Sequence, residues 1–299
     1  MIIAELAALS AAFCWALSGL ISINAIRKLG PLAFNRVRMS FVFLLLVGIS
    51  LFTGEWREFP LDTIQTLMIS GLIGIFLGDT ALFAALQRLG PSRTSIVFTF
   101  HAPMTVIMGW FILEEHLPWL TLLGCGIVTV GVLIAILGRR NNKEPQSIDS
   151  TQGRLRYGIA LGLLAAFGQA AGSIIARPIM VEGVDPVTAS AIRVGISALC
   201  LLCVGFIQNP LFRPKTHYTL KLIGIIMLSG LLAMGIGMTL LLYGLAIGDA
   251  GVVSTLAATQ PVLILPLLWL STGKSPPLIA WVSAVLTLIG LALITFSWG

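Results

Sequence analysis

Asp79 is an acidic residue in a stretch that is otherwise apolar or small, IFLGDTALFA (residues 75–84). It precedes Arg88 by nine residues, which places it about 13 Å from that basic end if the stretch is helical. At such a depth in a hydrocarbon core about 30 Å thick, a carboxylate is costly unless it takes a proton, pairs with a cation or faces water. Asp79 is therefore either a proton-coupling residue or a structural acid that holds two helices together.

His101 is the candidate partner of Asp79. It follows Arg93 by eight residues, about 12 Å into the next predicted helix, so the two residues have similar depths on consecutive antiparallel helices. Packed helices lie about 8–10 Å apart, so the side chains meet if both point the right way, which the sequence leaves open. His101 is interpreted either as a second proton-coupling residue or as a residue packed between helices.

Further polar residues share helix faces. Trp15, Ser18 and Ser22 follow one another at spacings of three and four, which places them on one face. Gln169 occupies the position equivalent to Trp15 in the second half of the chain, with Ser173 nearby, and we expect Trp15 and Gln169 to face each other across a cavity. For the serines, hydrogen bonding to their own backbone is the alternative. Other candidates for the pathway lining are Gln87, Thr99, Tyr243 and Gln260.

Two prolines and three arginines lie inside apolar runs. Pro103 and Pro261 are equivalent, and each frees a backbone carbonyl and bends its helix, which suits either a gate or a plain structural kink. Arg38 and Arg193, each seven residues beyond a proline, are interpreted as anchors that snorkel toward opposite interfaces. Arg177 is interpreted in the same way.

The composition is that of an integral membrane protein. Of 299 residues, 57% are hydrophobic and 10% charged, with a mean hydropathy of +1.00, whereas soluble domains are about 25% charged. The 18 Lys and Arg are scattered over short loops, which argues against a nucleic-acid partner. Cys200 and Cys203 have the spacing of a CxxC motif, but we interpret them as small core residues rather than as a metal site. Because GxxxxGK[ST], HExxH and GxSxG motifs are lacking, we expect no cofactor, no ATP-driven pump and no enzyme.

Ten apolar runs are long enough to cross a bilayer as helices. A polar segment, residues 139–156, separates five runs in residues 1–138 from five in 157–299 and is interpreted as a linker. The predicted spans are 3–23, 32–53, 63–87, 91–113, 118–138, 157–180, 187–208, 219–244, 249–271 and 278–298.

The two halves resemble each other, which indicates an internal repeat. An odd number of helices per half inverts the second half in the membrane, and matching loops carry opposite charge, as the positive-inside rule requires. For example, Arg27 and Lys28 in the first loop match Glu182 and Asp185. We therefore expect both termini on the non-cytoplasmic side. The matching segments include LSAAFCWA (9–16) with LLAAFGQA (163–170), GPLAFNRVR (30–38) with DPVTASAIR (185–193), and GLIGIFLGDT (71–80) with GLLAMGIGMT (230–239).

Several short motifs, in order along the chain, resemble the EamA branch of the drug/metabolite transporter superfamily. They include FCWALSG (13–19), LGPLAFNRVR (29–38), ALQRLGPSRTSIV (85–97) and TQP (259–261). The resemblance implies a small-solute carrier of the bacterial inner membrane, often an exporter of amino acids or other metabolites, with a cavity between the halves. A passive facilitator, exchanger or uptake permease is the alternative, and an intramembrane enzyme a more distant one. The expected partners are a small-molecule substrate and the lipid bilayer, and the protein is a monomer or a homodimer.

Overall fold

Ten helical spans of membrane length confirm the predicted all-α fold. The computed structural model describes residues 2–54, 59–140, 155–206, 214–273, 275 and 277–296. Most of the predicted linker, residues 141–154, lies outside the described residues. The spans are Ile2–Leu29, Pro31–Thr53, Leu61–Gly90, Arg93–Ile112, Trp119–Leu137, Leu155–Val181, Pro186–Gly205, Leu220–Ile247, Ala250–Leu267 and Leu278–Phe296.

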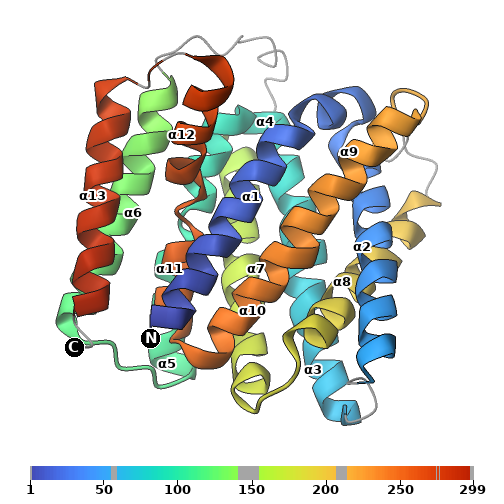
Figure 1. The fold of residues 1–299 in the computed structure, drawn as a ribbon, viewed down its shortest axis with the longest axis horizontal. Coiled ribbons are helices and arrows are strands. Elements are labelled where there is room, and N and C mark those ends of the chain that lie inside the picture. The colour runs from blue at the N-terminus through green and yellow to red at the C-terminus, as the bar shows by residue number, and fades with distance from the viewer. Residues whose placement is uncertain are drawn as a thin grey trace.

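Some spans contain more than one helical element (Figure 1). The third and eighth spans each contain a π-helical segment, named η2 and η4, and the fourth and ninth are broken in the middle. The elements are α1 (Ile2–Leu29), α2 (Pro31–Thr53), α3 (Leu61–Gly71), η2 (Leu72–Leu77), α4 (Gly78–Phe98), α5 (His101–Ile112), α6 (Trp119–Arg140), α7 (Leu155–Val181), α8 (Pro186–Gly205), α9 (Leu220–Gly230), η4 (Leu231–Gly237), α10 (Met238–Ile247), α11 (Ala250–Ala257), α12 (Gln260–Thr272) and α13 (Leu278–Phe296).

The arrangement of the chain agrees with an inverted repeat. Both termini lie at the lower end of the bundle in Figure 1, as an even number of crossings requires. With five spans in each half, the second half starts on the side opposite to the first. The two π-helical segments occupy the aligned sequences GLIGIFLGDT and GLLAMGIGMT, so an irregular element recurs at the same place in each half.

The two halves interlock through their first and third spans. Helix α1 packs against η4 and α10 of the second half, and α7 packs against η2 and α4 of the first. Glycines bring α7 and η2 together: a Cβ atom on Gly172 would lie 2.7 Å from the Cα atom of Gly74. Small residues allow such close backbone approach between membrane helices.

Helices α6 and α13 pack side by side at one edge of the bundle (Figure 1). A Cβ on Gly124 would lie 2.8 Å from the carbonyl oxygen of Gly290, and one on Gly131 would lie 2.6 Å from Oγ1 of Thr287. Gly124 and Gly131 of the fifth span therefore allow close packing against the tenth span.

The fourth and ninth spans are interrupted at equivalent places. Helix α4 ends at Phe98 and α5 begins at His101, while α11 ends at Ala257 and α12 begins at Gln260. Pro103 and Pro261 lie in the first turns of α5 and α12, where proline costs no helical hydrogen bond. The predicted distortions are thus present, and the gating role of the two prolines stays a prediction.

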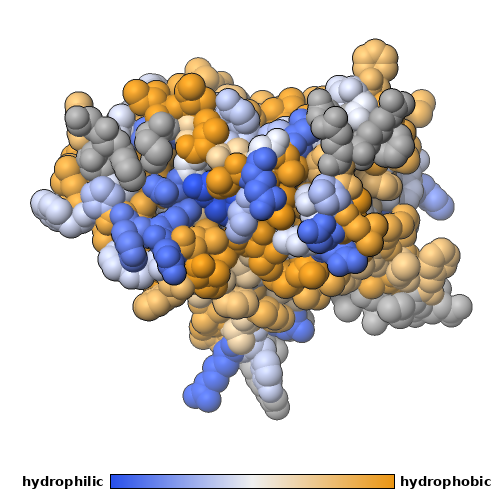
Figure 2. All heavy atoms as spheres, turned by 90° about the horizontal axis from the view of Figure 1, so that it is seen from below, coloured by the Kyte–Doolittle hydropathy of each residue, from blue (hydrophilic) through white to orange (hydrophobic). Residues whose placement is uncertain are grey.

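The end of the bundle that carries the termini has a mixed surface. Figure 2 shows hydrophilic atoms gathered within an outline that is mostly hydrophobic. This distribution suits a protein whose sides face lipid and whose helix ends face water.

Candidate functional site

Asp79 lies just beyond η2, at the start of α4, and pairs with residues of α2. Its Oδ2 atom is 3.7 Å from Nη2 of Arg38 and accepts a hydrogen bond of 3.3 Å from Nδ2 of Asn35. Asn35 in turn accepts hydrogen bonds of 3.1 and 2.7 Å from Nε and Nη2 of Arg38. The three side chains therefore form one polar cluster within two membrane-spanning helices.

The Arg38–Asp79 pair is largely but not fully enclosed. The side chains are 11% and 20% exposed, respectively. A carboxylate paired with a guanidinium and an amide is far less costly in a membrane than a bare one. The role of Asp79 in proton coupling stays a prediction.

Arg38 is not the interfacial anchor that the sequence suggested. Snorkelling requires the guanidinium to reach the membrane surface, whereas here it turns inward to Asn35 and Asp79. Arg177 lies near the end of α7, where its Nε donates to Oε1 of Glu115 at 3.1 Å, and its role as an anchor stays a prediction.

Arg193, the counterpart of Arg38, is even further from an interfacial anchor. Its exposed fraction is 0%. Nη1 donates a long hydrogen bond of 3.5 Å to the sulfur of Met238. Nε and Nη2 have no hydrogen-bond partner among the residues that the structure describes. Arg193 is therefore a membrane-buried cation, not an anchor.

His101 does not pair with Asp79. It is 5% exposed, and its ring lies 5.0 Å from that of Phe98, centroid to centroid. Its Nδ1 atom has no hydrogen-bond partner in the described part of the chain. The two side chains contact different neighbours. The contacts match the packing interpretation of His101, and its role in proton coupling stays a prediction.

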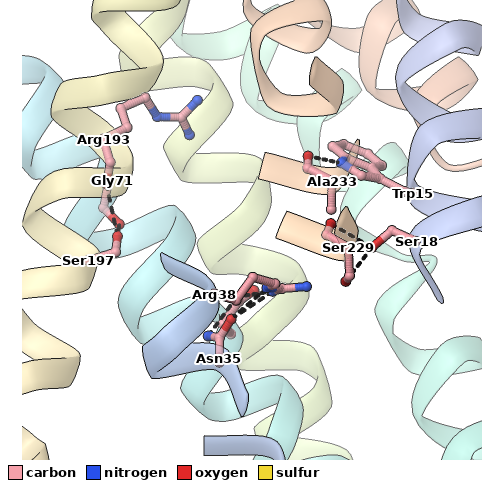
Figure 3. Close-up of polar contacts among 10 residues, drawn as sticks. Trp15, Ser18, Asn35, Arg38, Gly71, Arg193, Ser197, Ser229 and Ala233 are labelled. Atoms are coloured by element: carbon pink, nitrogen blue, oxygen red, sulfur yellow. Dashed lines mark hydrogen bonds and ion pairs between the residues drawn. The ribbon is translucent and has the colours of Figure 1, made fainter. Parts of the chain in front are cut away.

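Residues of α1 contact the second half of the protein (Figure 3). The indole Nε1 of Trp15 donates to the carbonyl of Ala233 in η4 at 2.8 Å, and the hydroxyls of Ser18 and Ser229 lie 2.8 Å apart. Nε2 of Gln260 donates to the carbonyl of Trp15 at 3.3 Å. Trp15, Ser18 and Gln260 thus lie where α1 meets the third and fourth spans of the other half.

The remaining predicted lining residues are dispersed. Ser22 donates to the carbonyl of Ser18, Ser173 to that of Gln169 and Thr99 to that of Ser95, which are bonds within a helix. Gln169 is half-buried, whereas Gln87 and Tyr243 are exposed. The backbone nitrogen of Gln169 would lie 3.9 Å from a Cβ atom on Gly78, the neighbour of Asp79. The roles of these residues in a pathway stay predictions.

A second ion pair lies at the end of the bundle that carries the termini. Glu115, just beyond α5, pairs with Arg177 of α7 and accepts hydrogen bonds from the backbone N–H of Ala250 at 2.9 and 3.2 Å. Arg177 also donates to the carbonyl of Leu245 at 2.6 Å. This network joins the fourth span to the sixth, eighth and ninth, and so ties the two halves together.

An apolar cavity of about 520 Å³ lies between α1, α12 and α13. Leu6, Phe13 and Leu288 line it and are also exposed on the outside of the bundle. The cavity therefore opens toward the membrane side of the protein. The Asp79 cluster, rather than this cavity, is the candidate site for a polar solute.

Sequence reasoning missed Asn35, and it gave Arg38 and Arg193 the wrong environment. One signal could have corrected this for the first half. Asn35 and Arg38 are three residues apart and share a helix face. An amide and a guanidinium on one face, about 6–10 Å beyond Pro31, indicate a polar cluster inside the bundle rather than two separate surface residues.

A family model decides the identity. The EamA-like transporter family model matches residues 2–137 and again 156–296. The chain belongs to the EamA-like transporter family. A solved structure, described only as a crystal structure of a protein, shares the fold with a TM-score of 0.79 and 18% identity, covering 98% of this chain and 97% of the other.

Curated relatives of this EamA protein are named as transporters. A probable amino-acid metabolite efflux pump of Salmonella typhimurium is 27% identical over 94% of this chain and 91% of its own length. An S-adenosylmethionine/S-adenosylhomocysteine transporter of Chlamydia muridarum is 26% identical over 42% of this chain. The match spans only 40% of that chlamydial protein.

Proposed function

We propose that this EamA protein is a secondary transporter that exports small metabolites, amino acids among them, in exchange for protons. The observation that carries the proposal is the Arg38–Asp79–Asn35 cluster inside the membrane-spanning region. The alignment with the Salmonella efflux pump, over nearly the whole of both chains, supports the solute class. Neither ATP nor a cofactor enters this proposal.

The cluster supplies a simple exchange mechanism. Asp79 holds Arg38 while no ligand is present. In one step of the cycle a proton neutralises the carboxylate. In another step the carboxylate is ionised, and the ammonium group of an amino acid replaces the guanidinium as its partner. Because one carboxylate accepts either the proton or the ammonium group, inward proton movement drives outward solute movement. The two halves rock around this point, which is the alternating access that inverted repeats permit.

Solute efflux from proteoliposomes tests the proposal. Vesicles loaded with an amino-acid mixture are compared with and without an imposed pH gradient, for the native protein and for Asp79→Asn. Gradient-driven efflux in the native protein that is lost in the variant, while solute exchange survives, is the expected result. The matched control is Asp62→Asn, an exposed acid in the first turn of α3. Equal flux in every condition would instead make the carrier passive and Asp79 structural.

We further propose that the protein lies in the bacterial inner membrane with both termini outside the cytoplasm. The positions of the basic loops support this orientation: Arg27 and Lys28 lie in the last turn of α1, opposite the end that carries the termini. A reporter enzyme fused to the C-terminus tests it. Activity of a periplasm-dependent reporter is expected, and activity of a cytoplasm-dependent one would reverse the topology.

A further inference from the structure

Arg193 is a cation whose hydrogen-bonding capacity is poorly used. A guanidinium carries five N–H donors, and a thioether sulfur is a weak acceptor. The contact of Nη1 with the sulfur of Met238 is therefore little compensation for full burial, and Nε and Nη2 donate to none of the described residues. A charge held in this way inside a membrane is expensive and marks a functional position.

The internal repeat shows what a guanidinium at this position binds. Arg38 and Arg193 are equivalent, as are Asp79 and Met238, and each arginine contacts the equivalent residue of its own half. In the first half that residue is a carboxylate, and in the second it is a thioether. The second half thus keeps the arginine but supplies no carboxylate of its own from this position.

Small residues surround the guanidinium of Arg193. A Cβ atom on Gly74 of η2 would lie 3.4 Å from Nη2 of Arg193. Ser190 and Thr239, which share a hydrogen bond of 3.1 Å, come from the same two elements, α8 and α10, that carry Arg193 and Met238. Figure 3 shows the guanidinium directed away from the Ser197–Gly71 contact, which lies one turn further along α8.

We propose that Arg193 is the binding site for the carboxylate group of a small solute, and that this group takes the place that Asp79 occupies beside Arg38. The planar fork of a guanidinium matches a carboxylate with two parallel hydrogen bonds. The inference rests on the proposed transport function, since it names the substrate class as small carboxylates, amino acids included.

The two arginines differ in access in a way that fits alternation between two states. Arg38 lies seven residues from the end of α2 opposite the termini and is partly exposed, whereas Arg193 lies seven residues from the end of α8 near the termini and is fully buried. The Glu115–Arg177 pair ties the two halves together at that second end. In the opposite state the halves exchange conformations, so Arg193 becomes the accessible arginine.

Ligand-induced stabilisation of the purified protein tests this site without any gradient. The probes are sodium propionate and L-alanine, with propionamide and L-alaninamide as controls that lack the carboxylate. A ligand that binds the folded protein raises its Tm with concentration. We expect the carboxylates to raise Tm and the amides not to. No shift with either carboxylate, or equal shifts with the amides, would overturn the proposal.

Three variants assign the effect to Arg193. Arg193→Gln should abolish the shift, and Arg193→Lys should weaken apparent binding by about tenfold or more, because the bidentate geometry is lost. Met238→Asp should also abolish it, because a built-in carboxylate then occupies the guanidinium. Circular dichroism checks that each variant is folded, and if Met238→Asp does not fold, Arg193→Gln decides. A carboxylate shift that persists in folded Arg193→Gln contradicts the proposal.

The outcome is separable from that of the proposed function. Carboxylate binding at Arg193 without gradient-driven efflux would refute proton coupling and leave the site in place. Efflux that depends on Asp79, with no carboxylate-specific binding, would refute the site and leave the transporter.

Discussion

The Arg38 and Arg193 regions have the same backbone plan and opposite electrostatics. Each arginine lies seven residues into the second span of its half, and each contacts the residue that follows a π-helical segment. In the first half an acid and an amide surround the guanidinium, and in the second a thioether does. In the duplicated fold, therefore, the arginine of one half pairs with a carboxylate, and the arginine of the other half contacts a thioether instead.

The π-helical segments explain why these contacts recur. A π-turn inserts one residue and rotates everything that follows around the helix axis, and such bulges are frequent at functional sites. The residue that contacts the arginine follows the π-helical segment closely in both halves: Asp79 is the second residue after η2, and Met238 is the first after η4. Both halves therefore have the irregular backbone, whereas only the first half has an acidic residue after it.

The largest effect is expected where the complete pair is broken. Arg38→Met leaves the carboxylate of Asp79 without its cation and should destabilise the protein by about 3 kcal/mol, near the lower end for buried pairs because the site is partly exposed. The measurement is thermal unfolding in detergent. The double variant Arg38→Met/Asp79→Met should recover most of the loss. A double variant as unstable as the single one would show that shape, not charge pairing, determines the effect.

The next largest effect is expected where α7 of the second half packs against η2 of the first half, and not where α1 makes the equivalent contact. Gly172→Leu should destabilise by about 2–3 kcal/mol, because its side chain would collide with the backbone of Gly74. The equivalent position in α1 is Ser18, which has room for a hydroxyl bonded to Ser229. Gly48→Leu is the control, since a Cβ there meets no atom within 4 Å. Equal tolerance of both changes in a melting experiment would contradict the close contact of α7 with η2.

A smaller effect of opposite sign is expected at Arg193. Arg193→Met removes an enclosed charge with little compensation and should raise stability by about 1–2 kcal/mol. Arg27→Met, at an exposed position in the last turn of α1, is the matched control and should change Tm little. A lower Tm for Arg193→Met would mean that the guanidinium is well satisfied in the folded protein. A gain in stability would be typical of a position kept for function.

Sequence reasoning was accurate where long segments or local chain chemistry decide the outcome. The ten spans follow from apolar length, and the breaks before Pro103 and Pro261 follow from the missing proline N–H. None of these inferences needs to know which way a side chain points.

Partners could not be predicted in the same way, because direction around the helix decides them. Residues 72–77 are π-helical, so a periodicity of 3.6 no longer gives the face on which Asp79 lies. His101 was therefore chosen by depth alone, and it packs on Phe98 instead. Arg193 was misjudged for another reason: the snorkelling rule assumes a free path to the surface, and close glycine packing around α8 removes that path.

The smallest effect concerns Asp249, just before α11 at the end that carries the termini. Burial, and then the nearby charge of Glu115, raise the pKa of this carboxyl group, while Arg177 opposes the shift. The folded protein thus holds this proton more tightly than the unfolded chain does. The resulting stabilisation is present at low pH and is lost as pH rises through the raised pKa.

Asp249→Asn isolates this contribution, because an amide does not titrate. Melting curves measured from acidic to neutral pH should show the native protein losing stability relative to the variant as pH rises. A constant difference across that range would show that Arg177 fully offsets burial and Glu115. A native protein that gains stability relative to the variant as pH rises would show that Arg177 outweighs them. The same experiment therefore asks, at the end of the bundle that carries the termini, whether an acid is governed by its enclosure or by its partner.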